Sequence, residues 1–228
     1  MQSGNTQGCL PLFLFAVFVV LFPLFLADVM ITALGRLGLS PRVTLLAAMG
    51  IFIGGMINIP VRRIEKNQPF DASSCRFFGL HRFFADQTCR QQHTVLAVNV
   101  GGCVIPCIIA AYELFRIAGH GPGALGLALT AVGINIFICY HTARPVANVG
   151  IAMPALVPAI AAAACALLLY RELAPPIAFC AGVLGPLIGA DLLHLKEIEK
   201  LNTGVASIGG AGTFDGIVLS GLLATLLA

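Results

Sequence analysis

Long, nearly uncharged apolar runs recur along this chain, and they limit what it can fold into. A bilayer core of about 30 Å is crossed by about 20 apolar residues in a helix that rises about 1.5 Å per residue. The sequence holds runs of this length from near its first residues to its last. Only 10% of the 228 residues are charged and 58% are hydrophobic, whereas about a quarter of a soluble domain is charged. The sequence therefore predicts an integral membrane protein.

The apolar runs are continuous rather than alternating, which predicts helices, because only helices and closed barrels satisfy their backbone groups in lipid. We expect an all-α transmembrane helix bundle of about seven spans, forming a single domain over residues 1–228. The expected spans are residues 10–34, 43–61, 94–118, 124–141, 150–170, 175–195 and a last span ending at 228. The last span opens with Gly209, Gly210 and Gly212. These glycines predict an unwound start that packs on protein or lines a cavity.

Charge in the loops predicts the orientation. The loops after the second, fourth and sixth spans are richer in Arg and Lys than the others, and such loops tend to stay in the cytoplasm. We therefore expect a multi-pass protein of the cell (inner) membrane, with a cytoplasmic N-terminus and the C-terminus outside. The net charge of +3 is too small to predict a nucleic-acid partner. The predicted partner is the lipid bilayer, and a transmembrane peptide substrate or other membrane proteins are further candidate partners.

The predicted cytoplasmic loop, residues 62–93, contains a set of metal-ligating side chains: Cys75, His81, Cys89 and His93. They could form a zinc site, but neither cysteine sits in a Cys-x-x-Cys pair. A disulfide between the two cysteines is disfavoured in the reducing cytoplasm. We expect instead a basic, aromatic loop at the lipid headgroups, and we predict no metal and no cofactor.

Two aspartates stand out, because an ionisable residue within a span is costly and is by default a functional candidate. Asp191 lies in the sixth expected span and Asp215 in the last, and both flank one loop, residues 196–207. They are therefore expected toward the same membrane face, on antiparallel helices. Small residues that allow close packing flank both aspartates, at Gly189, Gly210, Gly212 and Gly216.

Two carboxyls that lie close together share a proton, so that one acts as a base and the other as an acid. Asp191 and Asp215 are therefore candidate catalytic residues of an intramembrane peptidase that hydrolyses transmembrane peptides. We predict a direct or one-water hydrogen bond between them. Two alternatives stay open: a proton- or cation-coupled transporter or channel that uses the same aspartates, and a structural or assembly subunit whose carboxyls are capped by backbone.

Two further polar residues accompany the aspartates as candidate packing or substrate-contacting residues. Asn99 lies deep in the third expected span, where an amide commonly bonds across helices. Arg144 is expected on the same membrane face as the aspartates, where it contacts a lipid headgroup or pairs with Asp191. Pairing would weaken the acid–base hypothesis, because an arginine holds a carboxylate ionised.

Four segments carry a family resemblance: residues 99–106 (NVGGCVIP), 144–154 (RPVANVGIAMP), 185–192 (GPLIGADL) and 208–216 (IGGAGTFDG). Together they resemble the domain of unknown function 1614 family, which implies a prokaryotic multi-span membrane protein. The resemblance covers the chain from about Asn58 onward, and the loop of residues 62–93 is longer than that pattern. More loosely, the aspartates resemble those of the Gly-x-Gly-Asp intramembrane aspartyl proteases. However, Asp191 follows Gly-Ala and Asp215 follows Gly-Thr-Phe.

Overall fold

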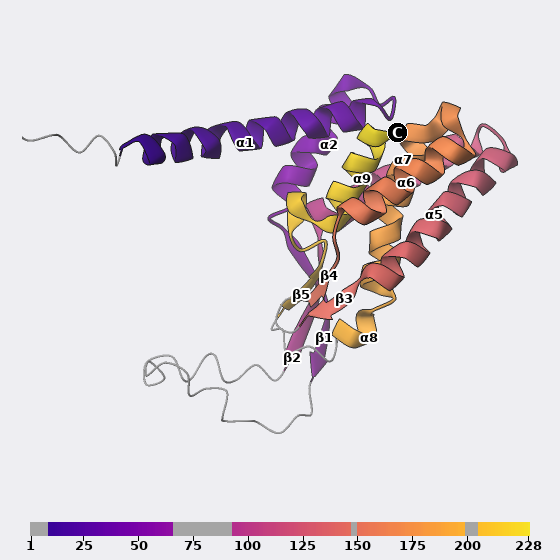
Figure 1. The fold of residues 1–228 in the computed structure, drawn as a ribbon. Helices are drawn as coiled ribbons and strands as arrows, with labels where there is room; N and C mark the ends of the chain where they lie inside the picture. Colours follow the sequence, from indigo (N-terminus) through magenta and orange to yellow (C-terminus); the bar gives the residue numbers. More distant parts are fainter. Residues whose placement is uncertain (1–8, 66–92, 147–149, 199–204) are drawn as a thin grey trace, which may run out of the picture.

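Helices make up most of the computed structural model, which describes residues 9–65, 93–146, 150–198 and 205–228 (Figure 1). Prolines open several of them, such as Pro41 and Pro122, where a fixed φ and a missing N–H suit the first turn. The α-helices are α1 (Cys9–Gly35), α2 (Pro41–Gly54), α4 (Ile105–Ala118), α5 (Pro122–Thr142), α6 (Leu156–Leu169), α7 (Ala174–Gly185), α8 (Leu195–Ile198) and α9 (Gly216–Leu227).

Three helical stretches of the described chain are long and apolar enough to cross a membrane: Val100–Ala118, Pro122–Thr142 and Arg171–Glu197. They suggest a membrane protein. Four shorter apolar helices accompany them: Leu21–Gly35, Pro41–Gly54, Leu156–Leu169 and Gly216–Leu227. A helix of 14 residues, such as α2, is only about 21 Å long. The predicted helical bundle is confirmed.

Helix α7 forms the centre of the bundle and packs against α4, α5, α6 and α9. Its residues are buried along nearly its whole length. Small residues make this packing possible: a Cβ atom at Gly182 would lie 2.8 Å from Ser220 O of α9. Close contact between helices through small residues is the usual way to associate in lipid, where burial of apolar surface gives little driving force.

Strands, which the sequence reading did not predict, lie at one end of the bundle (Figure 1). Strand β2 (His93–Asn99) pairs antiparallel with β1 (Asn58–Glu65) and parallel with β5 (Val205–Ile208). Strands β3 (Arg144–Val146) and β4 (Gly150–Ala152) form a separate hairpin. A register shift between Pro60 and Arg62 lies on β1, as is common for a proline near a sheet edge.

These strands correct the predicted span boundaries. The second span ends at Gly54 rather than at residue 61, and the third begins at residue 100 rather than 94. The fifth is helical only from Leu156. The physical reason is that a short apolar run rich in β-branched residues next to a helix has no periodicity that separates strand from helix.

Several short non-α helices interrupt the described chain. The π-helical segments are η2 (Val100–Val104), before α4, and η4 (Pro186–Leu192), after α7. A 3₁₀ turn, η3 (Arg171–Leu173), precedes α7, and another, η5 (Gly212–Phe214), precedes α9. The predicted unwound, glycine-rich start of the last helix is thus present. π-Helical turns inside α-helices often mark functional sites.

Candidate carboxylate site

Asn99 ties together the segments that surround the site. It is fully buried where β2 ends and η2 begins. Its Oδ1 accepts a hydrogen bond from Gly102 N at 2.7 Å and so caps η2. Its Nδ2 donates to Gly55 O at 2.8 Å and to Asn58 Oδ1 at 3.1 Å, and the Ser207 hydroxyl donates to the same Asn58 oxygen at 2.6 Å. The amide therefore joins the end of α2, the start of β1 and the first turn of η2.

Backbone-to-backbone contacts between glycines hold the unwound start of α9 in place. We call this set, Gly55, Gly101, Gly102, Gly209 and Gly212, the glycine node. A Cβ atom at Gly102 would lie 2.0 Å from Gly209 O, and one at Gly101 would lie 2.1 Å from Ile51 O. Gly209 and Gly212 also have positive φ angles, 70° and 60°, which glycine adopts without steric cost. The non-helical backbone before α9 thus packs on protein.

Asp215 caps the N-terminus of α9. Its Oδ1 accepts a hydrogen bond from Ile217 N at 3.0 Å, and its Oδ2 accepts a longer one from Ala211 N at 3.4 Å. Aspartate is among the preferred N-cap residues, because its oxygen satisfies an amide that lacks a partner within the helix. Both oxygens of this carboxyl thus accept hydrogen bonds from backbone amides. This is the arrangement expected if the protein is a structural or assembly subunit.

Asp191 has a different environment. It lies in η4 and is only partly exposed. It interacts electrostatically with Asp215 and with the thiols of Cys103 and Cys139. Its carboxyl has no hydrogen bond or ion pair with any residue that the structure describes. Among the described residues, none occupies the Asp191 oxygens, which suits uptake of a proton, water or a cation.

The two aspartates thus lie within electrostatic range of one another, on η4 and at the start of α9. No direct hydrogen bond between these two described residues is seen. A one-water bridge between them stays a prediction, as does a shared proton.

Arg144 does not neutralise Asp191. It is exposed on β3 and, among the described residues, forms no ion pair with Asp191. The described residues also contain no group of three or more His, Cys, Asp and Glu side chains that could hold a metal ion. Cys75, His81 and Cys89 of the predicted loop lie outside the described residues, as does the side chain of His93.

The other glycines predicted near the aspartates have unequal environments. A Cβ atom at Gly189 would lie 2.4 Å from Ile136 O of α5, so this glycine brings η4 against α5. One at Gly210, which is exposed, would meet only Ser207 of the preceding turn. One at Gly216 would have Met153 Cε, 3.8 Å away, as its nearest neighbour. Gly189 is thus required by packing, whereas Gly216 is not.

Cysteines around Asp191 were not predicted as part of the site. The thiols of Cys103 and Cys107 interact with each other, and Cys103 also interacts electrostatically with both aspartates. The two cysteines are four residues apart, which places their side chains on one helix face. This spacing is the feature of the sequence that could have predicted their interaction. Cys139 of α5 lies within electrostatic range of Asp191, and no local pattern could have revealed that proximity.

The described residues form an apolar helical bundle, suggestive of a membrane protein, with two aspartates near the end that carries the strands. The chain belongs to the family described as "Protein of unknown function (DUF1614)", whose model matches residues 52–227. The match includes both aspartates and the glycine node. No curated protein and no solved structure matches the chain. None of these comparisons supports the looser resemblance to Gly-x-Gly-Asp proteases.

Proposed function

We propose that this protein carries a proton or a small monovalent cation through the membrane, using Asp191 beside Asp215. The observation that supports this most is the environment of Asp191. Its carboxyl lies in an apolar helical stretch, faces the field of a second carboxyl and has no partner among the described residues. Uptake of a proton or cation relieves the repulsion between the two carboxyls. Ionisable residues in spans commonly mark ion or proton pathways.

The interrupted helices support the same function. Asp191 lies in a π-helical segment, and Asp215 caps a helix that follows an unwound, glycine-rich stretch. In many transporters the substrate or ion site is formed where membrane helices are broken. Here the break is held rigidly by the glycine node and Asn99, so the site would keep its geometry while its occupant changes.

A second candidate function is hydrolysis of transmembrane peptides by the same pair of aspartates. It is favoured by the electrostatic interaction between Asp191 and Asp215, since two neighbouring carboxyls can share a proton and activate water. The bonds from both Asp215 oxygens to backbone amides make the two carboxyls unequal, which suits an ion site better than a shared-proton pair.

The proposal includes the cellular setting predicted from the sequence: the cell membrane, a cytoplasmic N-terminus and an outside C-terminus. Reporter fusions at the two ends test this orientation. Finding both ends on one side would overturn it, because that arrangement requires an even number of crossings.

Flux measurements on purified protein in liposomes test the function. A pH gradient is imposed and decay is followed with a trapped pH-sensitive dye, and the experiment is repeated with Na⁺ or K⁺ gradients to separate a proton from a cation. We expect Asp191→Asn to lower the flux at least tenfold, because the amide cannot take up a proton or balance a cation. Asp28→Asn, at an exposed position on α1, is the matched control and should conduct like the wild type.

Two outcomes would contradict the proposal. Wild-type vesicles that leak no faster than empty ones, under every gradient, would exclude carriage of protons and of these cations. Equal flux through the wild type and Asp191→Asn would remove Asp191 from the path. Cleavage of a reconstituted transmembrane peptide by the wild type, lost in Asp191→Asn, would favour the hydrolase instead.

A further inference from the structure

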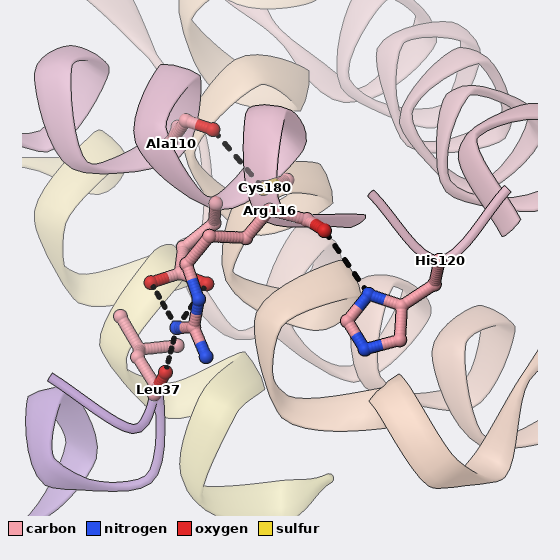
Figure 2. A network of polar contacts seen from close by, with 6 residues as sticks. Leu37, Ala110, Arg116, His120 and Cys180 are labelled. Carbon is pink, nitrogen blue, oxygen red and sulfur yellow. Dashed lines mark hydrogen bonds and ion pairs between the residues drawn. The ribbon is translucent and has the colours of Figure 1, made fainter. Parts of the chain in front are cut away.

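A third carboxyl lies inside the bundle, away from the aspartates. Glu113 of α4 is only 1% exposed. Arg116, one turn further along the helix, donates from one guanidinium nitrogen to both Glu113 oxygens, at 3.0 and 3.1 Å (Figure 2). The same nitrogen donates to Leu37 O in the turn between α1 and α2 (Figure 2). A fully buried ion within a span is expensive even when paired, so its position calls for an explanation beyond packing.

Polar groups connect this carboxyl with the aspartate site along the contact between α4 and α7. Cys103, Cys107, Ala110 and Glu113 follow one another at intervals of three or four residues, which places them on one face of η2 and α4. On the facing helix, Cys180 donates to Ala110 O at 3.4 Å (Figure 2) and interacts electrostatically with Glu113.

Cys103, at the other end of this face, lies within electrostatic range of both Asp191 and Asp215. Ser220 of α9, which packs on the other side of α7, is also fully buried, and its hydroxyl has no hydrogen-bond partner among the described residues. Its backbone oxygen lies against Gly182 of α7. Thiols and a backbone carbonyl thus lie along the contact between α4 and α7.

The depth of the two carboxyl sites fits this arrangement. Ten residues of helix separate Cys103 from Glu113, which is about 15 Å along the axis. That is about half of a hydrocarbon core of about 30 Å. A proton or cation that enters at Asp191 would therefore need a second binding group before it reached the opposite face of the membrane.

We propose that Glu113 is that second binding group, a carboxyl that takes up the proton or cation passed on from the Asp191 site, with Arg116 as its counterion. This inference rests on the function proposed above. Arg116 favours the ionised form of Glu113, whereas burial in the bundle favours the neutral acid, so the two effects oppose one another. When Glu113 accepts a proton, the proton adds to a carboxylate oxygen and displaces the Arg116 hydrogen bond; when it leaves, the ion pair reforms. Arg116 stays anchored throughout by its bond to Leu37 O. No covalent bond other than O–H is made or broken.

Two variants separate this role from a purely structural ion pair. Glu113→Gln removes the titrating group, and Glu113→Gln/Arg116→Gln removes both charges so that none is left buried without a partner. We expect both to lower the flux at least tenfold in the liposome assay. A structural pair predicts instead that the neutral double variant recovers the wild-type flux. Glu172→Gln, at an exposed position of η3, is the matched control and should conduct normally.

The outcomes distinguish the two proposals. No flux through the wild type contradicts the proposed function itself. Flux that is lost in Asp191→Asn but normal in Glu113→Gln contradicts only the role of Glu113. If the Glu113 variants fail to fold, labelling of the wild type with dicyclohexylcarbodiimide, which reacts with protonated carboxyls in apolar surroundings, replaces them. Modification of Glu113 with parallel loss of flux supports the inference, whereas full modification with unchanged flux overturns it.

Discussion

The two ends of α9 are held by different kinds of contact. At its start, backbone lies directly on backbone: Gly102 faces Gly209, and Gly212 faces Gly55. At its end, the long side chain of Arg36 reaches from the turn after α1 to donate to Leu226 O at 2.8 Å. A backbone contact has no room to adjust, whereas an exposed arginine can be replaced by water. The rigid end is the one that carries Asp215, which lies within electrostatic range of Asp191 in η4, as a site with fixed geometry requires.

The largest effect is expected at the glycine node. In Gly102→Ala the new methyl group would lie 2.0 Å from Gly209 O, and only a shift of backbone could relieve the clash. We expect a loss of about 3 kcal/mol or more in unfolding free energy, at the upper end of what overpacking costs. The midpoint of thermal unfolding in detergent, followed by circular dichroism, measures it.

Gly216→Ala is the matched control, because the nearest atom to its added methyl group is 3.8 Å away. It should be neutral or slightly stabilising, by roughly 0.5 kcal/mol, since alanine has less freedom than glycine in the unfolded chain. Equal destabilisation by the two substitutions would mean that the close approach at Gly102 does not hold the start of α9.

A smaller loss is expected from Asn99→Ala. The substitution removes the cap on Gly102 N and the donor to Gly55 O, in a position without exposure to solvent. Leaving buried polar groups without partners costs about 1–3 kcal/mol. Ser207→Ala removes a hydrogen bond to Asn58 in the same network that is exposed to solvent. It should therefore lower the unfolding free energy by less. The same unfolding measurement applies, and a Ser207 variant less stable than the Asn99 variant would contradict the ranking.

The helix bundle could be predicted from the sequence because the length of an apolar run and its low charge are local properties. They can be read from one segment without knowing which other segment it packs against. The expected span of residues 124–141 lies within α5, Pro122–Thr142, since no strand adjoins the start of that helix. The strands escaped prediction because the pairing of Val95 with Val205 joins distant segments of the chain. A hydrophobic pattern cannot reveal such a partner.

The candidate site was predictable in part, for a similar reason. Asp191 and Asp215 stand out because charge is rare in apolar runs. The role of Asp215 as an N-cap was also readable, since aspartate before an apolar helix is a start signal. The approach of Cys139 to Asp191 and the full burial of Glu113 depend on how the helices pack. The spacing of three residues between Glu113 and Arg116 is visible in the sequence, and the two residues do pair, but the burial of the Glu113 carboxyl in the core is not.

The smallest effect is expected where α9 ends. In Arg36→Gln the contact with Leu226 O is lost, and with it a positive charge beside carbonyls that have no partner within the helix. A cation at a helix C-terminus contributes about 0.3–1 kcal/mol at an exposed position, and salt screens it. We therefore expect a loss of less than about 1 kcal/mol that shrinks further as salt is raised from about 0.1 M to about 1 M, where the screening length falls from about 10 Å to about 3 Å. Arg42→Gln, at an exposed position in the first turn of α2, changes the net charge equally without touching α9 and should be neutral or slightly stabilising, because a cation is unfavourable at a helix N-terminus. If Arg36→Gln instead destabilised the protein as much as Gly102→Ala, the two ends of α9 would be equally rigid. The aspartates would then owe their geometry to the whole helix rather than to the glycine node at its start.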